Sequence, residues 1–247
     1  MVANQYYDEV ASKFARDIET GPRNEFRLQV MYPSVMQVIG DIRDQSALDL
    51  ACGTGVYARF LRQGGAARVT GVDISAGMIG VAQSYESARP LGITYLVHDV
   101  AGLPTLGAFD VAVAATLFNF ADSRQTLERM YERIRANLRP GGRLVALMQN
   151  AQFDPGATVI GQFGMHQRGH SPEDGSTVLV DLGDPPQTVT TWSWHRSTHE
   201  QVAEQAGFTR LQWHPHVSVA EPEHPDYVAF KKYLDNPHMV ILSAEAA

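Results

Sequence analysis

Small and acidic residues follow one another here in a spacing that could bind a nucleoside. The segment Ala47–Gly55 passes from an apolar run into a glycine turn, and Asp73 closes a second apolar run that begins at Val69. Gly53 and Gly55 have no Cβ, so a ligand can approach the backbone of the turn closely. A carboxylate at the end of the neighbouring strand can accept hydrogen bonds from ribose hydroxyls. The pattern predicts a nucleoside-binding site.

Alternating strand and helix patterns must position this site. The predicted strands of the core cover residues 47–51, 69–73, 93–97, 109–116 and 143–149. Helical patterns lie between them, and such β–α units predict a doubly wound, Rossmann-like, mostly parallel α/β sheet. Two further strands, 209–217 and 239–244, bring the sheet to seven and are expected to pair antiparallel at its edge.

The whole chain, residues 1–247, is predicted to form one domain. Residues 1–40, with helical patterns at 5–18 and 24–39, predict an N-terminal helical lid, and residues 47–149 form the nucleoside-binding core. Residues 150–190 are rich in Gly, Pro, Asp and His and are too long for an ordinary loop, so they predict a substrate-cap insertion after the fifth strand. Residues 191–247 are expected to supply the C-terminal part of the sheet.

The charge and the cysteine and histidine content of the chain limit the classes of partner and cofactor that it can bind. The net charge of −7 argues against a nucleic-acid or membrane partner, because both need a basic surface. The single cysteine excludes an intrachain disulfide and fits a cytoplasmic location. The nine histidines show no converging spacing, so we expect no metal site. We therefore expect a small-molecule substrate and a monomer or homodimer.

The glycine turn alone leaves the cofactor open. Gly53–Ala58 satisfies G-x-G-x-x-A, the dinucleotide fingerprint, so an NAD(P)-dependent oxidoreductase is one hypothesis. Tyr227 and Lys231 match a Tyr-x-x-x-Lys pair of some dehydrogenases. They follow the last crossover helix, far from the expected cofactor end, and we interpret them as a solvated helix face.

Five segments, in order and suitably spaced, resemble the motifs of the class I methyltransferases that depend on S-adenosylmethionine (SAM). They are Asp49-x-Ala51-x-Gly53-x-Gly55, Val69–Ser75, His98–Val100, Thr116–Phe120 and Leu138–Leu144. SAM has no pyrophosphate for a helix N-terminus to bind, and its adenosine needs two acids, which Asp73 and Asp99 supply. The resemblance implies a SAM site made of Tyr7, Asp49, Ala51, Cys52, Gly53, Gly55, Asp73, Ile74, Met78, His98, Asp99, Val100, Ala115 and Thr116.

Individual residues of this site carry more than one interpretation. In the family pattern Asp73 binds the ribose, Asp99 binds the adenine amine and the next backbone N–H contacts the ring. Asp49 could order the glycine turn or meet the methionine ammonium through water. Cys52, inside the turn, is interpreted as a small packing residue rather than a nucleophile.

The whole chain also resembles a bacterial small-molecule subgroup that includes toxoflavin synthase, an azapteridine N-methyltransferase. The resemblance rests on Tyr7-Asp8, Gly65–Ser75, Leu117–Asp122, Asp184–Pro186, Trp192-x-Trp194, Ala206–Phe208 and Trp213. It implies methyl transfer to N or O of a small heteroaromatic metabolite, driven mainly by proximity and alignment. A SAM-binding protein without catalysis is a further hypothesis.

Candidate substrate and catalytic residues lie at the expected ligand edge and in the insertion. The substrate candidates are Phe118, Asn119, Phe120, Trp192 and Trp194, and the catalytic candidates are Tyr7, His166 and His170. Tyr7 could close over the methionine end of SAM, and one of the two histidines could act as general base. Core packing for the aromatic side chains and a surface position for the histidines are the alternative interpretations.

Overall fold

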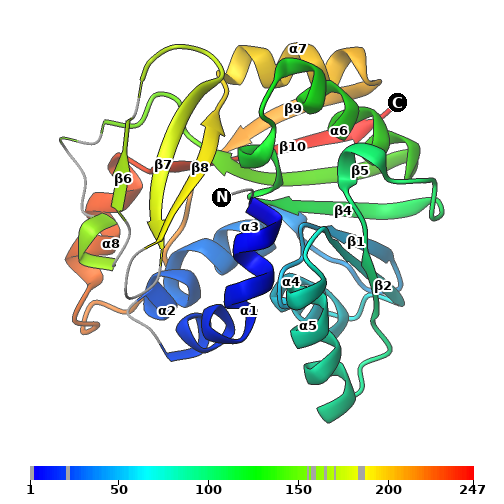
Figure 1. Cartoon of the computed structure of the whole chain (residues 1–247), viewed down its shortest axis with the longest axis horizontal. Helices are drawn as coiled ribbons and strands as arrows, with labels where there is room; N and C mark the ends of the chain where they lie inside the picture. Colours follow the sequence, from blue (N-terminus) through cyan, green and yellow to red (C-terminus); the bar gives the residue numbers. More distant parts are fainter. Residues whose placement is uncertain are drawn as a thin grey trace.

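A seven-stranded sheet forms the centre of the molecule (Figure 1). The computed structural model describes residues 3–20, 23–154, 156, 160–163, 166–169, 171–182 and 187–247. In spatial order the strands of the sheet are β3 (Thr94–Val97), β2 (Arg68–Asp73), β1 (Ser46–Leu50), β4 (Phe109–Ala115), β5 (Leu138–Gln149), β10 (Met239–Ala246) and β9 (Phe208–His214). β10 pairs antiparallel with both β5 and β9 and so runs against the other strands. The predicted doubly wound, mostly parallel α/β sheet is confirmed.

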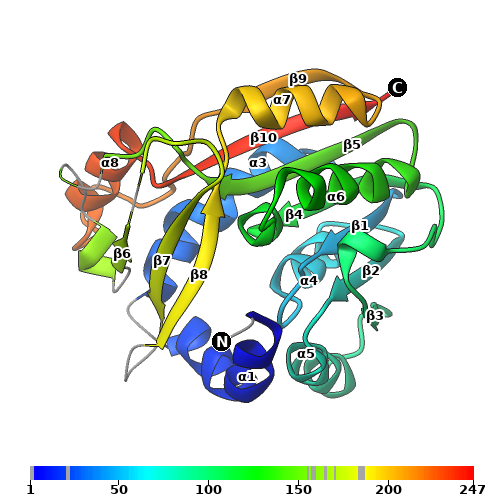
Figure 2. The same ribbon diagram turned by 45° about the horizontal axis from the view of Figure 1, so that its top comes forward.

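Helices cover both faces of the sheet (Figure 2). One face packs against α3 (Tyr32–Ile39), α4 (Val56–Gln63) and α5 (Ala76–Ala88). The other face packs against α6 (Arg124–Ala136) and α7 (Arg196–Gln205). None of the described helices is both long and apolar enough to cross a membrane.

The N-terminal helices precede this layer. They are α1 (Ala3–Thr20), α2 (Arg23–Phe26) and a π-helical turn, η1 (Arg27–Met31), which leads into α3. The helix predicted at 24–39 is therefore divided by the π-helical turn. α1 lies beside α5 in both views of the ribbon (Figures 1 and 2).

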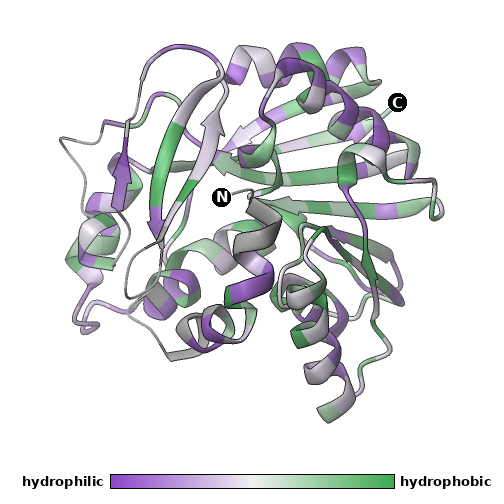
Figure 3. Cartoon of the chain, viewed as in Figure 1, coloured by the Kyte–Doolittle hydropathy of each residue, from purple (hydrophilic) through white to green (hydrophobic). Residues whose placement is uncertain are grey.

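Side chains of β4 alternate between two hydrophobic cores. Val111 and Val113 belong to the core under α3 and α4, whereas Ala112 and Ala114 belong to the core under α6 and α7. A strand buried on both faces requires an almost continuous apolar sequence, which β4 has. Figure 3 shows the hydrophobic colour concentrated in the central strands.

β5 begins earlier than predicted. The sequence predicts a strand from Arg143, but the structure extends it back to Leu138 through Pro140, Gly141 and Gly142. Phe109 pairs with Leu138, and the register then shifts so that Val111 pairs with Arg143. The proline–glycine segment is thus a bulge within the strand rather than a loop before it.

The insertion builds a second, three-stranded sheet. It consists of β6 (His166–Arg168), β7 (Ser176–Leu182) and β8 (Gln187–Ser193), all paired antiparallel. The boundary expected at residues 190 and 191 falls inside β8, so the inserted unit continues to Ser193.

A third core joins the insertion to the two ends of the chain. Phe163, from the short helix η5 (Ile160–Phe163), lies between Phe26 of α2 and Phe230 of α8 (Tyr227–Asp235). The ring centroids of Phe26 and Phe163 are 4.9 Å apart, and those of Phe163 and Phe230 are 5.3 Å apart. Stacking of this kind adds to the stabilisation that burial provides.

Candidate functional site

A side chain from β3 requires a glycine at one position of the turn after β1. Gly53 and Gly55 have φ angles of 54° and 79°, and Ala51 also has a positive φ of 54°. A Cβ on Gly55 would lie 2.3 Å from the Tyr95 hydroxyl oxygen, whereas a Cβ on Gly53 would meet nothing within 4 Å. Tyr95 was not among the predicted site residues, because nothing in the turn indicates a partner so distant in sequence.

Asp49 ties the end of β1 to the first turn of α4. Its Oδ2 accepts a hydrogen bond of 2.8 Å from the Ala58 N–H, which is one of the free N–H groups at the start of a helix. The other oxygen, Oδ1, is buried and has no hydrogen-bond partner among the described residues. Burial raises the pKa of this carboxyl to about 8, and the nearby Asp73 contributes to the increase.

Asp73 organises the same turn from the neighbouring strand. Its Oδ2 accepts from the Gly53 N–H at 2.8 Å, and its Oδ1 accepts from the Ser75 N–H at 2.9 Å. The residue is 8% exposed, and burial raises its pKa although these hydrogen bonds oppose the increase. Each carboxylate oxygen accepts one bond and so keeps a lone pair for a ligand.

Two apolar side chains are exposed beside these acids. Ile74, directly after Asp73, is 47% exposed, and Val97, which pairs with Asp73 across the strands, is 52% exposed. The His98 N–H donates to the Asp73 carbonyl at 2.9 Å, so β3 leads directly toward Asp99. Asp99 accepts from the Ala101 N–H at 2.9 Å and caps the turn η2 (Val100–Gly102). The sequence prediction included Ile74 but not Val97.

The remaining predicted cofactor residues are mostly buried beneath this surface. Met78 and Val100 are 2% and 4% exposed, and Ala115 is buried as the last residue of β4. Cys52 is also buried, and burial raises the pKa of its thiol, which favours the packing role over a nucleophilic one. Thr116 has a positive φ of 66° and donates its N–H to the Leu147 carbonyl at 2.7 Å.

The structure separates the three substrate candidates that follow β4, which lie in the turn η3 (Leu117–Phe120). Phe118 is 1% exposed and stacks on Tyr131 with 4.3 Å between ring centroids, so it belongs to the core. Asn119 is buried and accepts the Gln149 N–H at 2.9 Å, which fastens η3 to the end of β5. Phe120 is partly exposed and meets Tyr7 of α1 edge-on, with 6.1 Å between ring centroids.

The two tryptophans are likewise not brought together. Trp194 donates its indole N–H to the Ala121 carbonyl at 3.0 Å and packs against the α6–α7 core, whereas Trp192 remains partly exposed on β8. His166 is exposed on β6, opposite Asp181 of β7. Both views of the ribbon place β6 on the opposite side of the molecule from β1 and β2 (Figures 1 and 2). His170 lies outside the described residues. Within the described residues, no three His, Cys, Asp or Glu side chains gather as a metal site would require.

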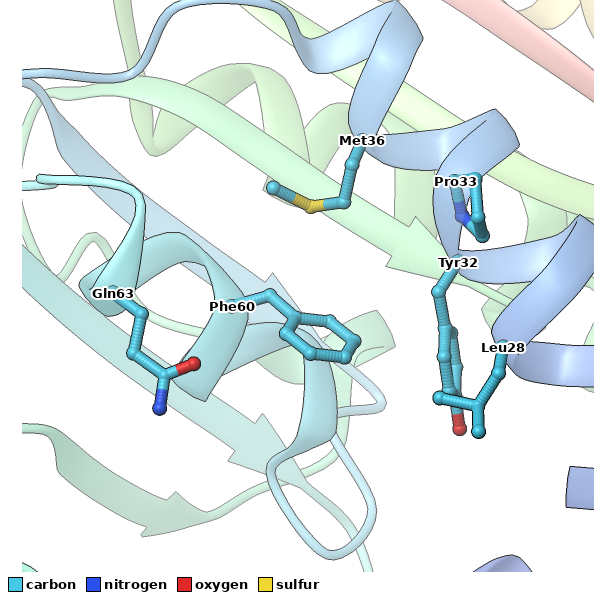
Figure 4. Close-up of a pocket in the computed structure, with 6 residues that line it drawn as sticks. All are labelled: Leu28, Tyr32, Pro33, Met36, Phe60 and Gln63. Atoms are coloured by element: carbon cyan, nitrogen blue, oxygen red, sulfur yellow. The ribbon is translucent and has the colours of Figure 1, made fainter. Parts of the chain in front are cut away.

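A groove elsewhere on the surface contains none of the predicted cofactor residues. It lies between η1, α3 and α4, where Tyr32 and Phe60 pack edge to face with 5.3 Å between ring centroids (Figure 4). Its lining residues are Leu28, Tyr32, Pro33, Met36, Phe60 and Gln63. The lining is apolar apart from one amide and one hydroxyl group, so the groove lacks the acids that a nucleoside needs.

Sequence comparison shows which family the core of the chain resembles. Residues 47–142 match the family described as methyltransferase domain. Ribosomal protein L11 methyltransferase of Burkholderia mallei is 33% identical over 100 residues, which are 40% of this chain and 30% of that protein. Ubiquinone biosynthesis O-methyltransferase of Coxiella burnetii is 31% identical over 113 residues, which are 45% of this chain and 47% of that protein. The chain thus spans less than half the length of these curated relatives.

Structural comparison extends the likeness to nearly the whole chain. A SAM-dependent methyltransferase from Clostridium acetobutylicum matches with a TM-score of 0.67 at 14% identity, over 96% of this chain and 98% of that one. The DhpI–SAM–HEP complex matches with a TM-score of 0.63 at 19% identity, over 97% of this chain and 94% of that one. The fold is therefore that of the SAM-dependent methyltransferases.

Proposed function

We propose that this protein, which has the class I SAM-dependent methyltransferase fold and a methyltransferase domain at residues 47–142, transfers a methyl group from SAM to a small heteroaromatic molecule. The observation that carries the choice of cofactor is the position of Asp49. A dinucleotide places its pyrophosphate on the helix N-terminus that follows the glycine turn. Here the Asp49 carboxyl already occupies that helix N-terminus through Ala58, and Asp73 lies nearby. A pyrophosphate here would lie beside two carboxyl groups, whereas the positive charge of SAM would stabilise their ionised forms, so the arrangement favours SAM over NAD(P).

The residues at the edge of the sheet fit the parts of SAM. Asp73 would accept the ribose hydroxyls, and Asp99 would accept the adenine amine. Ile74 and Val97 offer exposed apolar surface between these two acids, as a flat base requires. The unpartnered Oδ1 of Asp49 would meet the methionine ammonium through water.

Catalysis would consist mainly of alignment. When bound, SAM supplies an electrophilic methyl group on a sulfonium. The protein must hold the acceptor lone pair in line with the methyl–sulfur bond, and such alignment contributes about 7–11 kcal/mol. Tyr7 and Phe120, whose rings meet beside the end of β4, are the candidates for holding a flat acceptor, and Trp192 remains a third. An acceptor N–H or O–H would lose its proton to solvent or to a general base, for which His166 and His170 are the candidates.

Acceptor identity and catalysis are tested together by a transfer assay. The full chain is incubated with methyl-labelled SAM and a panel of heteroaromatic amines, ring N–H compounds and phenols. We expect label in at least one acceptor and little or no transfer by Asp73→Asn, because that variant loses the charge that binds the ribose. If the protein binds S-adenosylhomocysteine but labels no acceptor, the hypothesis of a non-catalytic SAM-binding protein replaces this one.

A further inference from the structure

The N-terminal helix α1 is fastened to α5 through one carboxylate. Asp8 Oδ1 accepts a hydrogen bond of 2.6 Å from the Ser75 hydroxyl and one of 2.9 Å from the Gly77 N–H. The Ser75 hydroxyl oxygen in turn accepts from the Met78 N–H at 3.1 Å, as an N-cap does. Asp8 therefore completes the cap of α5 from a different helix, at the end where the helix dipole favours a negative charge.

The two helices are also in close backbone contact at this point. A Cβ on Gly77 would lie 2.8 Å from the Asp8 carbonyl oxygen and 2.9 Å from its Cα. Gly80 lies almost one turn further along α5, and a Cβ there would meet nothing within 4 Å. Gly77, at the end of α5 that Asp8 caps, therefore has the backbone of α1 against it, whereas Gly80 does not.

This fastening adjoins the proposed ribose site. The Ser75 N–H donates to Asp73 Oδ1 at 2.9 Å, so Ser75 contacts both Asp8 and the proposed ribose acid Asp73. The residue before Asp8 is Tyr7, whose ring meets Phe120 on the other side. Asp8 therefore reaches the loop after β2, while Tyr7 reaches the loop after β4.

The strand order shows where α1 lies when it contacts the loops after β2 and β4. β1, with its glycine turn, lies between β2 and β4 in the sheet. A helix that contacts the loops after β2 and β4 must pass across the edge where the glycine turn lies. The beginning of α1 accordingly spans the mouth of the site that we assign to SAM.

We propose that Asp8 is a positioning residue that fastens α1 across the cofactor site, so that α1 retains the bound cofactor and holds Tyr7 against Phe120. This inference rests on the proposed function, because it requires a nucleoside cofactor beneath α1. Asp8 itself contacts α5 rather than the reacting atoms.

The test compares three variants of the full chain. Asp8→Ala removes the acceptor, Gly77→Ala pushes α1 away from α5, and Gly80→Ala is the matched control on the same helix. Hydrogen exchange of residues 3–20 reports the docking of α1 without ligand. Stopped-flow dissociation of S-adenosylhomocysteine reports retention of the cofactor.

We expect exchange in residues 3–20 to accelerate in Asp8→Ala and Gly77→Ala but not in Gly80→Ala. We expect the dissociation rate of S-adenosylhomocysteine to rise about tenfold in the first two variants, equivalent to about 1.4 kcal/mol, with a smaller increase in association. Asp8→Asn, which keeps an acceptor oxygen, should restore part of the retention.

The outcomes separate this inference from the proposed function. If wild-type protein binds no S-adenosylhomocysteine, the proposed function and the role of Asp8 both fail. If wild-type protein binds it and Asp8→Ala releases it at the wild-type rate, the positioning role alone fails. A loss of thermal stability in Asp8→Ala with an unchanged dissociation rate is the result expected of a merely structural residue, and it also overturns the inference.

Discussion

Replacing Gly55 by alanine tests how the glycine turn is built. A residue with a Cβ loses about 1–2 kcal/mol in a left-handed conformation, and φ at Gly55 is 79°. The new methyl group would also lie 2.3 Å from the Tyr95 hydroxyl oxygen and 2.8 Å from its Cζ. Overpacking of this kind costs about 1–3 kcal/mol, so Gly55→Ala should reduce the free energy of unfolding by about 2–5 kcal/mol.

Gly53→Ala is the matched control within the same turn. Its φ of 54° carries the conformational cost, but its Cβ would meet nothing within 4 Å. Urea unfolding without cofactor should therefore show a loss of only about 1–2 kcal/mol for Gly53→Ala, with an unchanged denaturant slope. In the background of Tyr95→Ala, the added cost of Gly55→Ala should fall to that of Gly53→Ala. Equal losses for the two glycine variants in the wild-type background would refute the role of Tyr95.

Two further predictions concern protonation. Because burial raises the pKa of Asp49 to about 8, its carboxyl is mostly protonated at pH 7, and binding of a ligand ammonium near Oδ1 should release a proton. Calorimetry of S-adenosylhomocysteine binding in two buffers of different ionisation enthalpy measures this release; no release would leave Asp49 with the turn-ordering role alone. Burial lowers the pKa of His199, His216 and His238 to about 3, 4 and 3. Below pH 6.5 these histidines therefore become protonated in the unfolded chain but stay neutral in the native state. The native state binds one extra proton at Asp49, which offsets one of the three histidine protons bound by the unfolded chain. As the pH is lowered from 6 to 5, the free energy of unfolding should therefore fall by on the order of 2–3 kcal/mol. Chemical unfolding at both values checks the slope, and equal stability at pH 6 and pH 5 would contradict it.

The sequence predicted the architecture well because hydrophobic periodicity decides it. The continuous apolar run of β4 and the motif that ends in Asp73 both lie where parallel packing requires. The early start of β5 was not predictable, because Pro140 and two glycines locally indicate a loop and only pairing with Phe109 shows a bulge. Tertiary contacts overrode the local signal there.

The positions of the candidate site residues in the fold were predictable where a motif fixes the backbone, and less so where a side chain could point to either side. Asp73 and Ile74 lie where their motif places them, at the end of a strand. Phe118 and Phe120 are two apart in a short 3₁₀ turn, and no local pattern indicates that the first packs on Tyr131 and the second meets Tyr7. The capping role of Asp8 was not predictable, because the helix that it caps lies far along the chain.

The most direct test of the central claim is a calorimetric titration of the wild-type chain with S-adenosylhomocysteine and, separately, with NAD⁺ and NADH. The account predicts saturable binding of S-adenosylhomocysteine that Asp73→Asn weakens strongly, and no binding of either nicotinamide dinucleotide. Tight binding of NAD⁺ or NADH without binding of S-adenosylhomocysteine would contradict it.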